Sequence, residues 1–550
     1  MWMTKGRGLT VALAIAGALI IAGTTSPNVK AGGVKEGGHL VATLSSDMVA
    51  ADPALASDGS SFYVANQVVE GLVGLKPGTI SDIVPVLAAS MPTESADGLA
   101  YTFKLRTGIK FHDGTDFNAD AVKYNYLRQQ HLPEKLRDTY DFYYGNVFGW
   151  GEKSNIASID TPDSQTVIFH LKRPQSNFLI SQTLVAFGIQ SPTALKAGDA
   201  DNPDPSQSKY YTGQGSGMVG TGPFKLAEWV PNDHVTIVKN PDYWNKSKAA
   251  HLDSVTFKPI SDQTAALNAL QAGDIDIAQL VSPQFLNLVK KDPNLRLVKR
   301  GEACNTANIG MTLTHAPVDN RDIRFAIAYA VNKPAYLKSF YGGLGQVADN
   351  WMPLNVQYAI PLGLPRYDPA MAREYIKKSG LTGDQLKIEL WYPSEFSRPY
   401  LPDAKGLFEA ISRDLTAIGL TVVPNTKSVP NGGYFKDVGG GLLPAYLHGW
   451  TCDWAGADNF LQAWLDAGAN QPQYAYKNPD VADAVNQALA ATDPQKTKEL
   501  WQKVQRALAA DMPTVPLVHA APVGASRKYV HGFVGAGNLV ELYNSVWLDK

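Results

Sequence analysis

The sequence predicts an α/β protein with several domains, and two patterns support this fold class. In some segments apolar and polar residues alternate, as in a half-buried strand; Tyr101, Phe103 and Leu105 are an example. In others, such as residues 319–333, apolar residues recur every three or four positions, as on one face of a helix. The length of 550 residues, 45% of them hydrophobic, is enough for two to four domains with cores of their own.

The N-terminus has the composition of a secretory signal peptide. Lys5 and Arg7 precede a mostly apolar run over residues 9–23, and small residues follow as far as Ala31. The run is shorter than the roughly 20 residues that span a bilayer, which favours a cleaved signal over residues 1–31 against the alternative of a retained membrane anchor. No cysteine lies near the expected cleavage site. We therefore expect a periplasmic protein that is not a lipoprotein.

The next segments predict the first strand and helix of the mature chain. We expect a strand over residues 37–42, a turn at Asp52-Pro53 and a helix over residues 60–72, where apolar residues have helical spacing.

A smaller α/β unit is predicted between residues 76 and 192. It starts at the turn signal Pro77-Gly78, and alternating residues indicate strands around residues 101–105 and 167–171. Between these strands, Asn118 is a typical N-cap for a helix.

A β-hairpin follows this unit. Its strands are expected over residues 224–230 and 234–239, after the string GTGPF at residues 220–224 and before NPDYW at residues 240–244. The hairpin leads to a helix over residues 262–273, which its final glycine ends, and then to a further strand.

The second half of the chain predicts a larger domain with the same mixture of elements. Helical spacing occurs in four segments: residues 319–333, 367–380, 404–418 and 497–510. The other expected elements are strands over residues 420–423 and 515–519 and a glycine-rich connection over residues 432–441.

Charge and motif content argue against several classes of function. The 49 Lys and Arg residues nearly balance the 51 Asp and Glu residues, so we expect no nucleic-acid-binding surface. The GxxxxGK[ST], HExxH and GxSxG patterns are absent and the ten histidines are scattered, so we expect no cofactor, no metal site and no catalytic residue. The chain is therefore predicted not to be an enzyme. A secreted hydrolase is the alternative outside the class of binding proteins.

One cation and one anion stand in loop-like segments of the second half. Arg398 precedes Pro399 and Tyr400, and Asp453 follows Trp450. Each charge alone is typical of a surface residue. If Arg398 and Asp453 line the same pocket, they can bind the two ends of a zwitterion. An Arg donates two parallel hydrogen bonds to a carboxylate, and an Asp accepts hydrogen bonds from an ammonium group. Tyr400 and Trp450 are candidates for the pocket walls, since aromatic rings supply contact area with little loss of rotamer freedom.

Several segments, in order along nearly the whole mature chain, resemble the peptide/nickel/opine solute-binding family of ABC importers, most of all its dipeptide-binding members. They are EGL at residues 70–72, FHDG at 111–114, GTGPF and NPDYW at 220–224 and 240–244, LNALQAGDIDI at 267–277, RPY at 398–400 and GWTCD at 449–453. The resemblance implies a periplasmic-binding-protein type II-like fold, with two α/β lobes joined by a hinge and an extra inserted α/β domain.

The resemblance also implies where the domains lie. The expected ranges are residues 1–31 for the signal peptide, 32–75 and 193–298 for lobe I, 76–192 for the inserted domain II, 299–512 for lobe III, and 513–550 for a C-terminal return to lobe I.

By the same resemblance, Arg398 binds the carboxylate of a ligand and Asp453 binds its α-amino group. Tyr400, Trp450 and Thr451 are the other expected ligand contacts.

The two cysteines, Cys304 and Cys452, resemble a pair that forms a disulfide in some relatives. Two buried free thiols are the alternative.

The function implied is that of the substrate-binding component of an ABC importer. It would capture dipeptides or short peptides between its lobes and deliver them, as a monomer, to permease subunits driven by cytoplasmic ATPases. The alternative ligands are an opine, a modified sugar or oligosaccharide, and nickel or a metal chelate. They are kept because residues 452 and 454–457 differ from the dipeptide-binding pattern and residues 428–437 contain no tryptophan.

Overall fold

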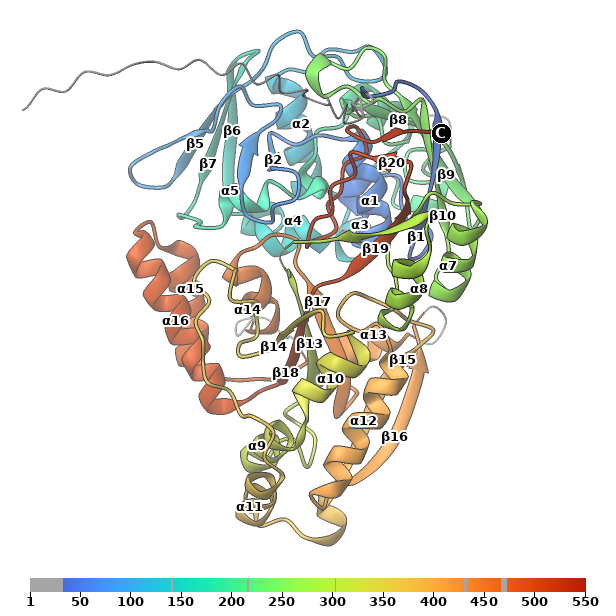
Figure 1. The fold of residues 1–550 in the computed structure, drawn as a ribbon. Helices are drawn as coiled ribbons and strands as arrows, with labels where there is room; N and C mark the ends of the chain where they lie inside the picture. The colour runs from blue at the N-terminus through green and yellow to red at the C-terminus, as the bar shows by residue number, and fades with distance from the viewer. Residues whose placement is uncertain (1–32, 140–141, 215–216, 302, 430–432, 466–471) are drawn as a thin grey trace, which may run out of the picture. The chain divides into compact units, whose positions relative to one another are not determined.

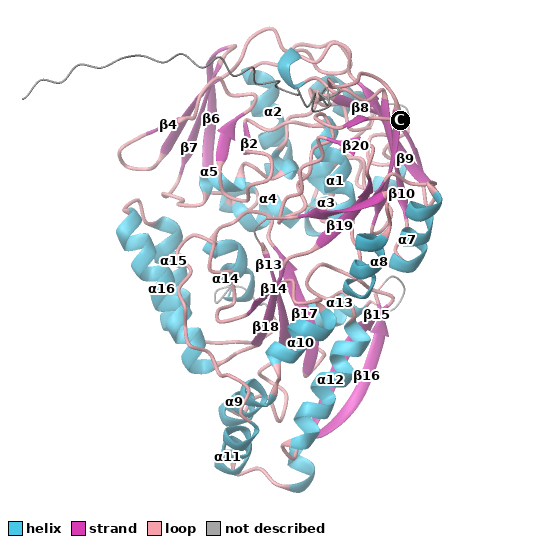
Figure 2. Cartoon of the chain, viewed as in Figure 1, coloured by secondary structure: helices cyan, strands magenta, loops and turns pink. Residues whose placement is uncertain are grey.

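A computed structural model describes residues 33–139, 142–214, 217–301, 303–429, 433–465 and 472–550. The predicted signal peptide lies outside these residues. The chain divides into residues 1–34 and residues 35–550, and the sheets and helices described here belong to the second unit (Figure 1). Strands and helices are mixed along the whole of this unit, as expected for an α/β protein (Figure 2).

Lobe I is built on a seven-stranded mixed sheet. Its middle strand β1 is parallel to β10 and β11, and the remaining pairs are antiparallel. Leu40, Ala42 and Leu44 of β1 are fully buried, as is usual for a central strand. In sheet order the strands are β12 (Leu295–Lys299), β19 (Val523–Arg527), β11 (Ile277–Ala278), β1 (His39–Leu44), β10 (Ser254–Pro259), β9 (His234–Lys239) and β8 (Phe224–Val230).

The β8–β9 hairpin confirms the prediction over residues 224–230 and 234–239. Smaller elements complete this part of the chain: helices α1 (Gly59–Val68), α6 (Pro192–Ala197), α7 (Gln263–Ala272) and α8 (Leu286–Lys291), and strand pairs β2 (Val73–Leu75) with β3 (Ile83–Pro85) and β20 (Val530–His531) with β21 (Trp547–Leu548).

A four-stranded antiparallel sheet lies within residues 93–171 and has a core of aromatic side chains. Tyr126 packs edge-to-face on Phe169, with ring centroids 4.8 Å apart, and both are fully buried. The sheet consists of β4 (Thr93–Glu94), β5 (Ala100–Lys104), β7 (Thr166–Leu171) and β6 (Ile156–Asp163). The helices of this region are α2 (Ala119–Gln130), α3 (Glu134–Thr139), α4 (Phe142–Val147) and α5 (Phe178–Ser181).

Lobe III is built on a six-stranded sheet with helices packed against it. Every residue of its strand β13 is buried. In sheet order the strands are β14 (Gly345–Val347), β18 (Val515–Ala520), β13 (Asn305–Met311), β17 (Ala445–Thr451), β15 (Lys387–Ser394) and β16 (Thr421–Ser428). The helices are α9 (Arg321–Ala330), α10 (Lys333–Phe340), α11 (Pro369–Ser379), α12 (Ala404–Ala417), α13 (Tyr434–Gly439), α14 (Ala457–Leu465), α15 (Pro479–Ala490) and α16 (Pro494–Asp511).

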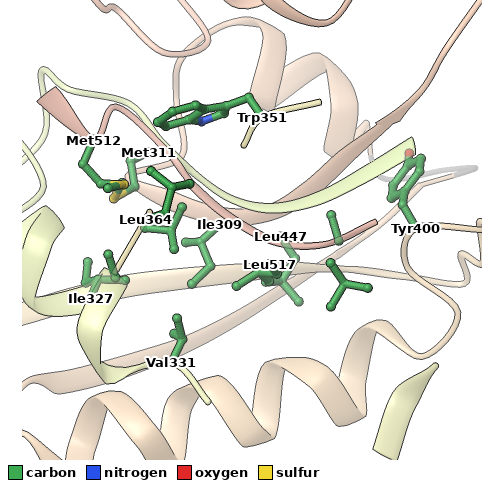
Figure 3. Packing of buried hydrophobic residues seen from close by; sticks show 14 of the residues in the cluster. Ile309, Met311, Ile327, Val331, Trp351, Leu364, Tyr400, Leu447, Met512 and Leu517 are labelled. Carbon is green, nitrogen blue, oxygen red and sulfur yellow. The ribbon is translucent and has the colours of Figure 1, made fainter. Parts of the chain in front are cut away.

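The core of lobe III joins three neighbouring strands. Ile309 of β13, Leu447 of β17 and Leu517 of β18 are at most 1% exposed and lie next to one another (Figure 3). Burying a side chain of this size stabilises the fold by about 1.5–3 kcal/mol. Trp351 is fully buried in the same core, and its Nε1 donates a hydrogen bond to Thr514 Oγ1 at 2.7 Å.

The chain crosses between the two large sheets at two adjacent places. One crossing lies between Lys299 of β12 and Asn305 of β13, and the other lies between Ala520 of β18 and Val523 of β19. Because β12 pairs with β19 and β13 pairs with β18, the crossings run side by side, which is the arrangement of a two-stranded hinge.

The return of the C-terminus to lobe I begins later than predicted. The prediction placed all of residues 513–550 in lobe I, but β18 pairs with β13 and β14 in the sheet of lobe III. The physical reason is that β18 is buried along its whole length and apolar except for His519, so its pattern fits the interior of either sheet. The return begins with β19, which pairs with β11 and β12.

One local prediction in lobe III was also wrong. The glycine-rich connection over residues 432–441 contains helix α13, which Tyr434 anchors by donating a hydrogen bond from its buried hydroxyl to Leu447 O at 2.9 Å. The helix expected over residues 319–333 is confirmed as α9 with narrower bounds, and Asn332 caps the next helix, α10, by accepting from Ala335 N.

Candidate ligand-binding site

A cavity of about 350 Å³ lies between side chains of lobe I, the inserted domain and lobe III. Small-molecule sites in proteins typically have volumes of about 300–1,000 Å³. The five predicted contact residues all line it: Arg398, Tyr400, Trp450, Thr451 and Asp453. They come from two segments of lobe III, the turn after β15 and the end of β17.

Arg398 is held by a tight turn. Its backbone N–H donates to Leu401 O at 3.3 Å, and Leu401 N–H donates to Arg398 O at 2.9 Å. The guanidinium lies 5.1 Å from the ring centroid of Phe396, and its Nη1 is 3.4 Å from Ser45 Oγ and 3.3 Å from Ser397 O. These contacts are all uncharged, so the planar fork can still pair with a carboxylate.

Asp453 is fixed by two hydrogen bonds to its carboxylate. Oδ1 accepts from the hydroxyl of Tyr143 at 2.8 Å, and Oδ2 accepts from Asn459 Nδ2 at 3.0 Å. Burial raises the pKa of Asp453 to about 6, and the hydrogen bonds from Asn459 and Tyr143 act in the opposite direction. At pH 7 the carboxylate is therefore mostly ionised and able to bind an ammonium group.

A disulfide positions the segment that carries Asp453. It joins Cys304, next to the start of β13, to Cys452, with a Cα–Cα distance of 5.4 Å. The backbone N–H of Cys452 also donates to Cys304 O at 2.8 Å, which continues the β13–β17 pairing by one more residue.

The three remaining predicted residues contribute walls and one polar group. Tyr400 is 8% exposed, and Trp450 is held by a hydrogen bond from its Nε1 to Asn459 Oδ1 at 2.9 Å. The Oγ1 of Thr451 is buried and has no hydrogen-bond partner in the described part of the chain. A ligand that donates or accepts here would satisfy it.

No group of three or more His, Cys, Asp or Glu side chains suited to holding a metal ion occurs among the residues that the structure describes. Within the same residues, no helix is both long enough and apolar enough to cross a bilayer.

The model of a family described as bacterial extracellular solute-binding proteins, family 5 (middle part) matches residues 82–503. The chain belongs to this family. Among curated proteins, family 5 relatives include Di/tripeptide-binding protein 1 of Pseudomonas aeruginosa (strain UCBPP-PA14), 31% identical over 507 residues that cover 88% of this chain and 89% of the relative. Glutathione-binding protein GsiB of Escherichia coli (strain K12) is 31% identical over 505 residues, 90% of this chain and 91% of the relative.

Solved structures support the family 5 fold. The periplasmic binding protein DppA of Helicobacter pylori, in complex with the peptide STSA, aligns with a TM-score of 0.78 and 27% identity over 94% of this chain and 99% of that one. A dipeptide-binding protein of Pseudoalteromonas sp. SM9913 in complex with Met-Leu aligns with a TM-score of 0.80 over 93% of this chain and 100% of that one; at 22% identity it supports the fold alone. The chain is thus a family 5 solute-binding protein with the type II fold of two lobes.

The sequence reasoning missed most of the other residues that line the cavity, and three of them are polar groups of particular interest. Asp58 at the start of α1, Tyr143 in α4 and Asn538 in the C-terminal segment all line it. Asn538 Nδ2 is buried without a hydrogen-bond partner among the described residues, and the adjacent Leu539 has a positive φ of 64°. The only local signal at Asp58 is that Asp is a common helix N-cap. No local pattern distinguishes Tyr143 or Asn538, because tertiary packing alone brings them to the cavity.

Proposed function

We propose that this family 5 protein is the substrate-binding component of an ABC importer and that it captures dipeptides or short peptides with free termini. The observation that carries the proposal is the presence of Arg398 and Asp453 on one cavity. A peptide zwitterion has one carboxylate and one ammonium, so each end meets a group of opposite charge.

The energetics favour a ligand that is charged at both ends. Removing an ionised group from water costs several kcal/mol unless an opposite charge and hydrogen bonds replace the lost hydration. Arg398 offers N–H donors to the carboxylate of the peptide, and Asp453 accepts from its ammonium. Micromolar binding requires about −8 kcal/mol, which is available only if both charges are paired.

The names of the relatives support a peptide ligand. One is named for di- and tripeptides, another for glutathione, and the structure of DppA holds the peptide STSA. Glutathione is the second candidate ligand, because a relative with that name has the same 31% identity to this chain. Opines, oligosaccharides and metal chelates are the other ligands to be tested for binding.

The remaining parts of the proposal concern location and partners. The protein is exported by the signal peptide at residues 1–31, carries no lipid anchor and acts in the periplasm as a monomer. It releases its ligand, chemically unchanged, to the permease subunits, whose ATPases lie in the cytoplasm. Analysis of a peptide recovered after incubation separates this role from that of a secreted hydrolase, which would cleave it.

Titration calorimetry tests the proposal. We expect Ala-Ala to bind the wild-type protein, and we expect Arg398→Ala and Asp453→Asn each to weaken binding at least a hundredfold. Truncating one partner of such a pair typically costs roughly 3–5 kcal/mol. Arg413→Ala and Asp480→Asn, at exposed positions on α12 and α15, are the matched controls and should bind normally. Normal binding by both cavity variants would overturn the proposal, as would binding of a sugar or nickel with no peptide binding.

A further inference from the structure

The cavity lining has one more negative charge than a peptide of zero net charge can pair. Among the described residues, its lining holds three charged side chains: Asp58, Arg398 and Asp453. In the proposed function, Arg398 pairs with the carboxylate of the peptide and Asp453 pairs with its ammonium. Asp58 then remains as a second carboxylate without a counter-charge in the same cavity.

Asp58 uses only one of its two carboxylate oxygens for the fold. Oδ1 accepts a hydrogen bond from Ser61 N at 2.8 Å and so caps helix α1. Oδ2 is buried and, within the part of the chain that the structure describes, has no hydrogen-bond partner. A buried carboxylate oxygen in this state is unfavourable until a donor reaches it.

Asp58 lines the same cavity as the residues assigned to both ends of the peptide. Burial raises the pKa of its carboxyl, while hydrogen bonds with Ser61 and the positive charge of Arg398 act against that rise. On the other side, burial is the main cause of the raised pKa of Tyr143; the charge of Asp453, to which the Tyr143 hydroxyl donates, and then that of Asp58 add to it. Asp58, Arg398, Tyr143 and Asp453 thus share one cavity, and the charge of Asp58 interacts with those of its neighbours.

We propose that the cavity selects peptides that carry one cationic side chain, and that the carboxylate of Asp58 receives the ammonium or guanidinium group of that side chain. This inference rests on the proposed function, since it takes the two peptide ends as already paired. With both acids ionised, the lining carries a net charge of −1. A lysyl or arginyl peptide carries a net charge of +1 and neutralises the lining, whereas a neutral peptide leaves Asp58 buried without a partner.

The test compares pairs of peptides that differ only in the charge of one side chain. Calorimetry measures Ala-Lys against Ala-norleucine, and Lys-Ala against norleucine-Ala, so that the cationic side chain is tested at each position of the dipeptide. We expect the wild-type protein to bind the lysyl member of at least one pair tenfold or more tightly than its norleucine counterpart. In Asp58→Asn the preference should fall below threefold, because the norleucine peptides then no longer leave a charge buried without a partner.

The variants preserve the fold. Asparagine and serine also cap helices, so both Asp58→Asn and Asp58→Ser can retain the hydrogen bond to α1; the asparagine removes the charge at nearly constant shape, and the serine also removes the second carboxylate oxygen. Asp493→Asn removes the charge of the N-cap of α16, an exposed position outside the cavity lining, and should leave the lysine preference intact. Unchanged melting temperatures in all three variants show that any loss of preference is not a loss of folding.

Each result decides between the two proposals. Equal affinity of the wild-type protein for lysyl and norleucine peptides, or an unchanged preference in Asp58→Asn, overturns the role of Asp58 and leaves the peptide-binding function in place. Absence of binding in all four peptides, together with binding of a ligand from another class, overturns both.

Discussion

The ionisation of Asp453 controls how the proposed site binds the ammonium group of a peptide. Its carboxyl has a pKa of about 6, raised by burial and held from rising further by hydrogen bonds from Asn459 and Tyr143. An ammonium group binds the ionised form, so protonation of Asp453 competes with the ligand. The carboxylate of a peptide stays ionised well below pH 6, and its ammonium stays protonated there, so Asp453 is the group that limits binding at acidic pH.

We predict that the affinity for a dipeptide is highest near pH 7 and falls roughly tenfold at pH 5, where about one tenth of a carboxyl with this pKa is ionised. Calorimetry over this pH range measures the fall, and binding near pH 6 should release a proton to the buffer. In Asp453→Asn the affinity should be low and nearly independent of pH between 7 and 5. A fall of the same size in this variant would show that another group is responsible.

At the same scale, the sequence identified the residues whose chemistry is conspicuous and missed those that tertiary structure brings in. Arg398 and Asp453 were found because lone charges beside Pro and Trp are visible in the sequence and because their segments resemble a family. Tyr143 and Asn538 belong to segments far away in the chain, so no local pattern connects them with the cavity.

At the scale of elements, the disulfide between Cys304 and Cys452 is the link that fixes the end of β17 to the start of β13. It closes a loop with a sequence separation of 148 residues. In the chain-entropy model a cross-link over a long loop stabilises a protein by limiting its unfolded state, typically by about 2–4 kcal/mol and by up to about 5.

We predict that replacing both cysteines by serine lowers the free energy of unfolding by about 2–5 kcal/mol. The variant should also bind dipeptides more weakly, because Asp453 directly follows Cys452. Urea unfolding with and without a reductant measures the effect. The reductant should lower the free energy of unfolding of the wild-type protein and leave that of the double-serine variant unchanged. If the reductant has no effect on wild-type stability, the two cysteines act as separate thiols.

A buried ion pair ties the C-terminal segment to the crossing between the sheets. Arg300 donates from Nε to Glu541 Oε1 at 2.6 Å and from Nη2 to Oε2 at 3.0 Å, and both side chains are 0% exposed. Oε2 of Glu541 also accepts from the hydroxyl of Tyr63 at 2.8 Å.

We predict that Glu541→Gln destabilises the protein by about 3–5 kcal/mol, because the charge of Arg300 is then buried without a partner. Thermal and urea unfolding measure this change. Asp384→Asn is the control: it removes an exposed ion pair with Lys387, at 2.8 Å, and should have little effect because water already solvates both groups. Similar unfolding of the two variants would mean that the buried pair adds no stability.

Elements were predictable where local signals agree. The β8–β9 hairpin was predicted at its observed bounds because alternation and turn signals coincide there. The strand at residues 515–520 was found, but its sheet was not, because the choice of β13 as its partner depends on the arrangement of the whole lobe. Helix α13 was missed because glycine indicates a turn, whereas the contact of Tyr434 with β17 stabilises a helix.

At the scale of the whole molecule, the inserted domain contacts lobe III both at the cavity and outside its lining. Tyr143 donates to Asp453 in the cavity, and outside the lining Asn177 Nδ2 donates to Asp458 Oδ2 at 2.6 Å. Ser176 N–H donates to Leu489 O at 2.7 Å. The inserted domain thus supplies part of the wall of the site, and the exact limits of each domain along the chain stay a prediction of the family resemblance.

The central claim is that Asp453 and Arg398 bind opposite ends of one peptide, and a thermodynamic cycle tests it most directly. Calorimetry compares Ala-Ala with its N-acetyl derivative, which lacks the ammonium, in the wild-type protein, in Asp453→Asn and in Arg398→Ala. We predict that acetylation weakens binding at least a hundredfold in the wild-type protein, still weakens it strongly in Arg398→Ala, and has less than a threefold effect in Asp453→Asn. An equal penalty for acetylation in the wild-type protein and in Asp453→Asn would contradict the claim.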